Sequence, residues 1–162
     1  MEDLLSLPVQ IFVLGGGQPE YVKIFEDAAA AHPDRVYMNV NYSDGLAKKF
    51  YAGCDAILMP SRFEPCGLSQ MMALRYGALP VIRETGGLKD TVAVYGKADK
   101  PTGFGFEEAD SQDLLACLEN LCKVYKEEKG TWQEMADRGM KKNYSWKASC
   151  KKYEKLYGKL LK

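Results

Sequence analysis

The chain has 162 residues, of which 46% are apolar, and its 22 Lys and Arg balance its 22 Asp and Glu. This length and composition suit one globular domain with its own core. A balanced charge provides no net positive field, so neither a nucleic acid nor an anionic membrane is an expected partner.

Apolar runs of strand length alternate with segments of helical pattern. Buried strands are predicted at residues 9–14, 35–40, 56–60 and 79–83. Helices are predicted between them at residues 19–31, 43–54 and 68–76. Pro19 suits a first helical turn, Ser43 an N-cap and Gly77 a left-handed C-terminal cap. This alternation predicts an α/β fold with a Rossmann-like, doubly wound parallel sheet.

The pattern becomes helical after Gly105. Three helices are predicted there, at residues 111–128, 131–138 and 145–161. The segment from Val94 to Gly105 is the longest irregular stretch and the expected mobile one. The last helix forms an apolar stripe, from Trp146 to Leu160, that packs either on this domain's own core or on a separate domain.

The five cysteines have irregular spacings without a C-x-x-C pair, which indicates reduced thiols rather than a disulfide framework. The first ten residues lack the basic and apolar pattern of a signal peptide. No apolar run reaches the roughly 18 residues of a membrane span. We therefore expect a cytoplasmic protein that does not enter a membrane.

A ligand of an open α/β sheet lies beyond the carboxyl ends of the strands. The connection after the third strand, Ser61 to Ser69, is the most informative one. Gly67 lets its backbone approach a ligand, and the free N–H groups at the following helix start suit a phosphate. Glu64 lies beside them, where it can accept hydrogen bonds from sugar hydroxyls. Alternatively, Glu64 is a solvated loop charge and the segment is a plain helix start.

The run from Pro60 to Val92, PSRFEPCGLSQMMALRYGALPVIRETGGLKDTV, resembles the signature of bacterial glycogen synthases and plant starch synthases. The resemblance covers essentially the whole chain and is densest in this run. It implies the two-domain B-type glycosyltransferase fold, with residues 1–162 as the C-terminal domain that binds the nucleotide sugar. It also implies retaining glucosyl transfer from ADP-glucose to an α-1,4-glucan, the reaction of glycogen and starch biosynthesis.

The resemblance assigns roles to the residues around the third strand's end. Glu64 corresponds to the catalytic carboxylate that holds the donor glucose. Cys66 and Gly67 would approach the glucose through their backbone, and Leu68 and Ser69 would meet the diphosphate.

Two further connections carry donor-binding residues by the same resemblance. Asn41 and Tyr42 follow the second strand, and Tyr42 corresponds to the aromatic residue that stacks on adenine. Its alternative is a helix-entry residue that packs on its neighbour. Thr85, Gly86 and Gly87 resemble the loop beside the donor pocket, and their alternative is a turn that ends the fourth strand.

Two absences refine the predicted chemistry. Many retaining transferases of this fold have a second glutamate eight positions after the first, where this chain has Met72. The single Glu64 fits the glycogen and starch synthase pattern and favours ADP-glucose. The one histidine, His32, and the absence of clustered cysteines or a D-x-D pair predict no metal site and no cofactor, so helix N-termini and basic side chains would meet the donor's charge.

The resemblance also implies an N-terminal domain that is absent from this chain and would hold the α-1,4-glucan acceptor. It also implies an Arg and a Lys, just upstream of the first strand, that bind the diphosphate and are absent from this chain. We therefore expect the chain to bind ADP weakly and to transfer no glucose alone. A UDP-sugar transferase or epimerase of the same fold, and a stand-alone nucleotide-binding module, are the alternatives.

Overall fold

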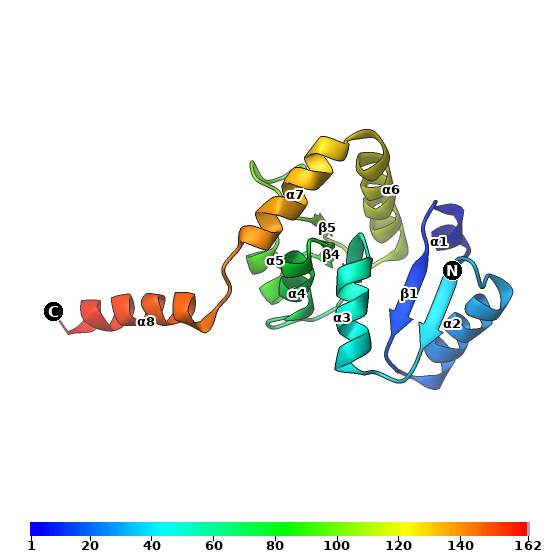
Figure 1. The fold of residues 1–162 in the computed structure, drawn as a ribbon, viewed down its shortest axis with the longest axis horizontal. Helices are drawn as coiled ribbons and strands as arrows, with labels where there is room; N and C mark the ends of the chain where they lie inside the picture. Colours follow the sequence, from blue (N-terminus) through cyan, green and yellow to red (C-terminus); the bar gives the residue numbers. More distant parts are fainter. Residues whose placement is uncertain (162) are drawn as a thin grey trace.

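The computed structural model describes residues 1–161 and shows parallel strands flanked by helices (Figure 1). The strands are β1 (Ile11–Leu14), β2 (Val36–Asn39), β3 (Ala56–Met59), β4 (Leu79–Arg83) and β5 (Phe104–Phe106). The helices are α1 (Glu2–Ser6), α2 (Pro19–Ala31), α3 (Asp44–Gly53), α4 (Ser69–Tyr76), α5 (Gly86–Thr91), α6 (Ser111–Glu127), α7 (Lys129–Lys141) and α8 (Trp146–Leu160). Every predicted strand and helix is present, and α1, α5 and β5 are additional.

Local sequence signals place the helix ends. The Ser43 hydroxyl accepts a hydrogen bond from the Leu46 amide at 3.2 Å and so caps α3, as predicted. Pro19 occupies the first turn of α2. Gly77 ends α4 with a φ of 86°, a conformation that favours glycine.

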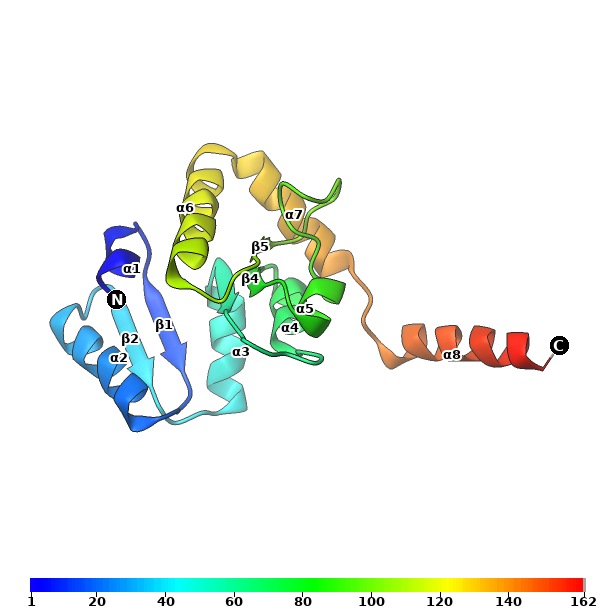
Figure 2. The same ribbon diagram turned by 180° about the vertical axis from the view of Figure 1, so that it is seen from behind.

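The strands form two parallel sheets rather than one continuous sheet. β1 pairs with β2, and β4 lies between β3 and β5. Figures 1 and 2 show β1 on the side of β2 that faces the three-stranded sheet. In the described part of the chain, β1 and β3 are paired on one side only. Phe12 of β1 and Leu58 of β3 are accordingly 55% and 40% exposed, so the doubly wound sheet is divided at this point.

The core surrounds β4, which is covered on both faces. Leu79 and Val81 point to one face, where they pack in a cluster with Phe104, Val124, Trp132 and Met135 from β5, α6 and α7. Ile82 points to the other face and packs with Leu88 of α5 and with Val92. Because neighbouring side chains of a strand alternate between faces, the apolar residues 79–82 are buried on both faces, as expected of a central parallel strand, and Arg83 at the end of the strand is partly buried.

Helix α8 extends away from the rest of the chain (Figures 1 and 2). It contains no buried residue over Trp146–Leu160, and Trp146 is 83% exposed. The apolar stripe of this helix therefore does not pack on the domain's own core, and that alternative of the sequence analysis is wrong. Across residues 1–161, no helix is both long and apolar enough to cross a membrane.

Candidate functional site

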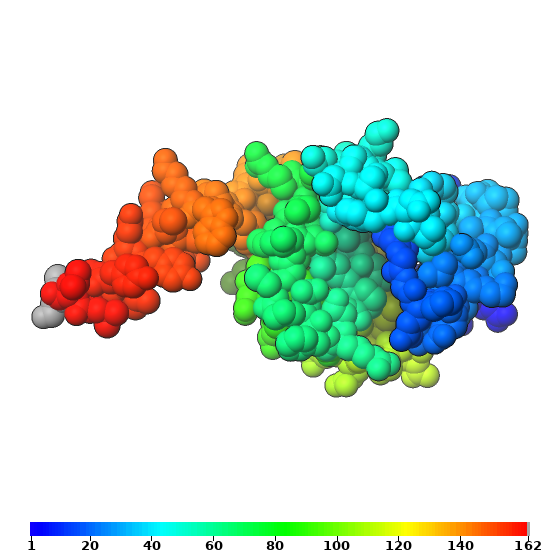
Figure 3. Space-filling view, turned by 90° about the horizontal axis from the view of Figure 1, so that it is seen from below, coloured from blue at the N-terminus to red at the C-terminus, as the bar shows by residue number. Residues whose placement is uncertain are grey.

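The carboxyl ends of the strands point to one side of the molecule. Figure 3 views that side, from below Figure 1, and shows a furrow between the blue segment that follows β1 and the green segment that follows β3. The residues predicted to bind the donor lie in the connections that follow β2, β3 and β4. Their arrangement decides whether they form one site.

Arg83, at the end of β4, holds the loop after β3, Ser61–Leu68, in place. The Arg83 guanidinium donates hydrogen bonds to the carbonyl oxygens of Ser61 at 2.9 Å, Glu107 at 3.1 Å and Arg62. Hydrogen bonds from a charged donor contribute about 1.5–3 kcal/mol each. One side chain thus ties the loop after β3 to the connection after β5.

The start of α5 packs directly against this loop. The Gly87 amide donates a hydrogen bond to the Glu64 carbonyl oxygen at 3.1 Å. A Cβ on Gly86 would overlap the Glu64 carbonyl, and one on Gly87 would overlap the Cys66 carbonyl. The two backbones can approach only because both residues are glycines. Gly86 and Gly87 therefore form one unit with Glu64 and Cys66, and Thr85 immediately precedes them as the N-cap of α5.

The loop ends in a turn that leads into α4. Gly67 has a φ of 70°, in the left-handed region, and Leu68 is the N-cap. Among residues 1–161, no side chain caps this helix start. The first amides of α4 are thus left for solvent or a ligand, and with the helix dipole they favour an anion. Glu64, half-buried, lies in the same loop.

Tyr42 and Asn41 lie apart from that unit, at the end of β2. Tyr42 is 64% exposed, which leaves its side chain available for stacking. Its hydroxyl donates a hydrogen bond to Asp44 at 3.2 Å, which raises the pKa of the phenol. Within the described chain, no hydrogen bond links Asn41 or Tyr42 to the Glu64–Ser69 segment. The structure therefore unites the connections after β3 and β4 and leaves the one after β2 separate.

An ion cluster borders the β4 and β5 ends and was not predicted from the sequence. Lys97 contacts Glu84 at 2.6 Å and Glu107 at 2.5 Å. The hydrogen bonds to Glu107 and Glu84 raise the pKa of Lys97, and the bond from Lys97 lowers the pKa of Glu107. Lys97 belongs to the irregular segment 94–103, and this cluster fastens the middle of that segment to the sheet.

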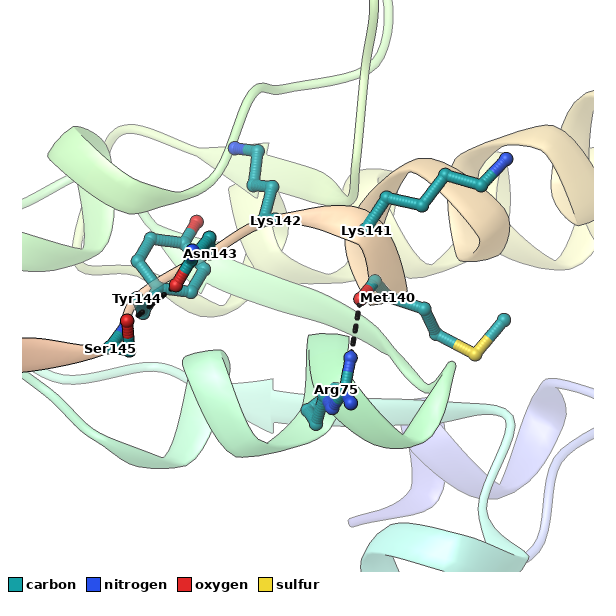
Figure 4. Close-up of a pocket in the computed structure, with 7 residues that line it drawn as sticks. All are labelled: Arg75, Met140, Lys141, Lys142, Asn143, Tyr144 and Ser145. Carbon is teal, nitrogen blue, oxygen red and sulfur yellow. Dashed lines mark hydrogen bonds between the residues drawn. The ribbon is translucent and has the colours of Figure 1, made fainter. Parts of the chain in front are cut away.

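A surface hollow lies away from this site (Figure 4). It measures about 670 Å³ and lies beneath the linker between α7 and α8. Arg75 donates to the Met140 carbonyl at 3.0 Å, and Lys142 donates to the Thr91 carbonyl at 2.9 Å. Lys141 points away from the other side chains in Figure 4. Arg75 thus holds the last turn of α7, and Lys142 holds the start of the linker.

The cysteines differ in their surroundings. Cys66, in the Ser61–Leu68 loop, and Cys150 are exposed. Burial raises the pKa of the Cys117 thiol to about 11. Throughout residues 1–161, no three His, Cys, Asp or Glu side chains gather closely enough to hold a metal ion.

Comparison with known proteins identifies relatives for nearly the whole chain. The family described as glycosyl transferases group 1 matches residues 1–138. A glycogen synthase of Lachnospira eligens is 47% identical over 161 residues, which are 99% of this chain and 34% of the relative. A glycogen synthase of Lachnoclostridium phytofermentans is 45% identical over 161 residues, with the same coverage of 99% and 34%.

A solved structure also matches the fold. The catalytic domain of starch synthase IV from Arabidopsis thaliana, bound to ADP and acarbose, is 34% identical and superposes with a TM-score of 0.84. The match covers 96% of this chain and 33% of that one. The chain thus spans about a third of the length of the relatives it matches.

Proposed function

Because this chain belongs to the glycosyl transferases group 1 family, we propose that it binds the nucleotide-sugar donor of a glucosyltransferase that elongates an α-1,4-glucan. The observation that carries this proposal is the uncapped start of α4. It follows the left-handed turn at Gly67 and lies in the same loop as Glu64. A diphosphate at these amides would have its sugar directed towards the Glu64 loop.

We propose ADP-glucose as the donor. The starch synthase that matches this chain was solved with ADP. Met72, in place of a second glutamate, also fits the glycogen and starch synthase pattern. Exposed Tyr42 supplies a stacking surface for adenine, and base–aromatic stacking contributes about 1–3 kcal/mol per base in proteins that bind single-stranded nucleic acids.

In the proposed reaction, the α4 start binds the leaving group and Glu64 binds the sugar. The amides at Leu68 and Ser69 stabilise the negative charge of the departing ADP. Glu64 fixes the glucose and stabilises the positive charge that develops on its ring. The acceptor hydroxyl attacks the anomeric carbon, and exclusion of water from the closed site favours the glucan over hydrolysis.

We further propose that the remaining two-thirds of a longer protein provides the acceptor site and the basic residues that bind the diphosphate. The exposed apolar stripe of α8 supports this proposal because it leaves apolar side chains uncovered. On this view the chain alone binds ADP weakly and transfers no glucose. Five free cysteines support a reducing location, the cytoplasm.

Protection of Cys66 from alkylation tests the proposed donor site. ADP at a saturating concentration should slow the reaction of Cys66 with iodoacetamide about fivefold or more, because ligand covers the loop. Cys150, which is also exposed, serves as the internal reference and should react at an unchanged rate, while Cys117 should stay unlabelled at pH 8. Peptide mass spectrometry measures all three. Equal protection of Cys66 and Cys150, or none at Cys66, would count against the site.

A further inference from the structure

Gln70 is a fully buried polar residue in the first turn of α4. It is 0% exposed and shares the inward face of the helix with Ala73 and Leu74. A buried carboxamide is unfavourable unless its polar atoms are bonded. The two N–H groups of Gln70 Nε2 are shared among three acceptors, the carbonyl oxygens of Cys66 at 3.1 Å and Gly67 at 3.0 Å and the Thr91 hydroxyl at 3.1 Å.

These partners fix the orientation of the carboxamide. Two of them are carbonyl oxygens, which can only accept, so the nitrogen must face them. The Oε1 atom then has no hydrogen-bond partner in the described part of the chain. It lies against the Cα of Gly67, where an added Cβ would stand 2.5 Å from it. A side chain at residue 67 would therefore displace the carboxamide from this position, and Gly67 is also the residue with a φ of 70°.

Thr91, at the end of α5, holds the carboxamide from the other side. Its hydroxyl accepts from Gln70 and donates to the Gly87 carbonyl at 2.7 Å. The Thr91 carbonyl accepts from Lys142 at 2.9 Å and from the Tyr144 hydroxyl at 2.8 Å. The turn before α4 is therefore anchored through Gln70 to α5 and to the linker that leads to α8.

We propose that Gln70 is a positioning residue of the donor site. Its carboxamide holds the Cys66–Gly67 turn in the conformation that presents the first amides of α4 to the donor's phosphates. Gln70 does not contact the donor and acts through the two carbonyls that it binds. Thr91 acts in turn through Gln70. This inference rests on the proposed function for its ligand, but the order of the turn is a property of the free chain.

Two variants of Gln70 test the proposal. Gln70→Met keeps the length of the side chain and removes its donor, and Gln70→Glu places an oxygen against the two carbonyls. Each should weaken ADP binding about five- to thirty-fold, as expected from the loss of one or two hydrogen bonds. The backbone order parameter of Gly67 should fall from about 0.85 to below about 0.6 in the free chain. Gln133→Met, on the exposed face of α7, is the matched control and should change neither quantity.

Thr91 provides a second test that does not disturb the core as strongly. Thr91→Val should weaken ADP binding about two- to five-fold, and Thr91→Ser, which keeps the hydroxyl, should restore it. In the double variant with Gln70→Met, the loss should be no greater than in Gln70→Met alone, because both residues act on the same turn.

Three results would contradict different parts of the proposal. ADP affinity within twofold of the wild type in Gln70→Met, with an unchanged order parameter at Gly67, would overturn the proposal. Additive effects of Thr91→Val and Gln70→Met would overturn the role given to Thr91. Failure of the wild-type chain to bind ADP would refute the donor site itself, whereas a loosened turn in Gln70→Met would still support Gln70 as the residue that holds it.

Discussion

Gly87→Ala is expected to lower the free energy of unfolding and to weaken ADP binding at least tenfold. Gly87 is buried, and an added Cβ would overlap the Cys66 carbonyl and lie 2.6 Å from the Cys66 Cα. Both neighbours are backbone atoms, so neither can rotate away. Overpacking of this kind costs about 1–3 kcal/mol. The two segments must separate, which also breaks the hydrogen bond from the Gly87 amide to the Glu64 carbonyl.

Urea unfolding and an ADP titration measure the two effects of Gly87→Ala. Gly130→Ala is the matched control, since Gly130 lies in the first turn of α7 and a Cβ there would meet nothing within 4 Å. The free energy of unfolding of Gly130→Ala should equal that of the wild type or exceed it by about 0.5–1 kcal/mol. If Gly87→Ala matched this control in stability and bound ADP like the wild type, the loop would not depend on α5.

Glu64→Gln is expected to lower kcat about 10²–10³-fold in a longer protein that contains this chain and transfers glucose. Gln keeps the size and one acceptor oxygen of Glu64 but removes its negative charge. The charge matters most in the transition state, so KM should change little. The loop itself should be preserved, because the Gly87 amide bonds to the main-chain carbonyl of residue 64 and not to its side chain.

Incorporation of labelled glucose into glycogen measures this effect. Glu119→Gln, on an exposed part of α6, makes the same chemical change away from the site and should leave kcat unaltered. ADP binding to the chain should be similar in both variants. Turnover of Glu64→Gln at the wild-type rate would remove Glu64 from the chemistry.

Local signals in the sequence predicted most of the fold. Ser43, Pro19 and Gly77 mark helix ends through interactions within a few residues, so they could be recognised without a structure. The start of α5 could not, because two glycines are poor helix formers. β5 is only three residues long, Phe104–Phe106, and follows an irregular segment that hides it.

Packing between distant segments was harder to predict. The stripe on α8 indicated an apolar face correctly, but periodicity does not say what such a face contacts, and here it is exposed. The division into two sheets likewise depends on strand pairing, which the apolar runs do not determine. Both features concern surfaces whose partners are far apart in sequence.

Contacts between distant segments of the candidate site were likewise not predicted. Glu64 and Cys66 were predicted in the connection after the third strand and Gly87 in the one after the fourth, and the structure brings the two connections together through main-chain contacts. Arg83 and Gln70 were missed because they bind main-chain carbonyl oxygens, and every residue has such an oxygen, so the sequence does not indicate which one is bound. Their unusual positions could nevertheless have been noticed. Arg83 is a charge at the end of an apolar strand, and Gln70 shares the helical face of Ala73 and Leu74.

The most direct test of the proposed donor site is an amide NMR titration of the chain with ADP and, separately, with UDP. We expect larger shifts with ADP than with UDP, localised at Tyr42 and at Gly67–Ser69. Tyr42→Ala should weaken the ADP response, and Tyr21→Ala, which alters another exposed tyrosine on α2, should not. Larger shifts with UDP would contradict the assignment of ADP, and no shift at Gly67–Ser69 with millimolar ADP would contradict the site.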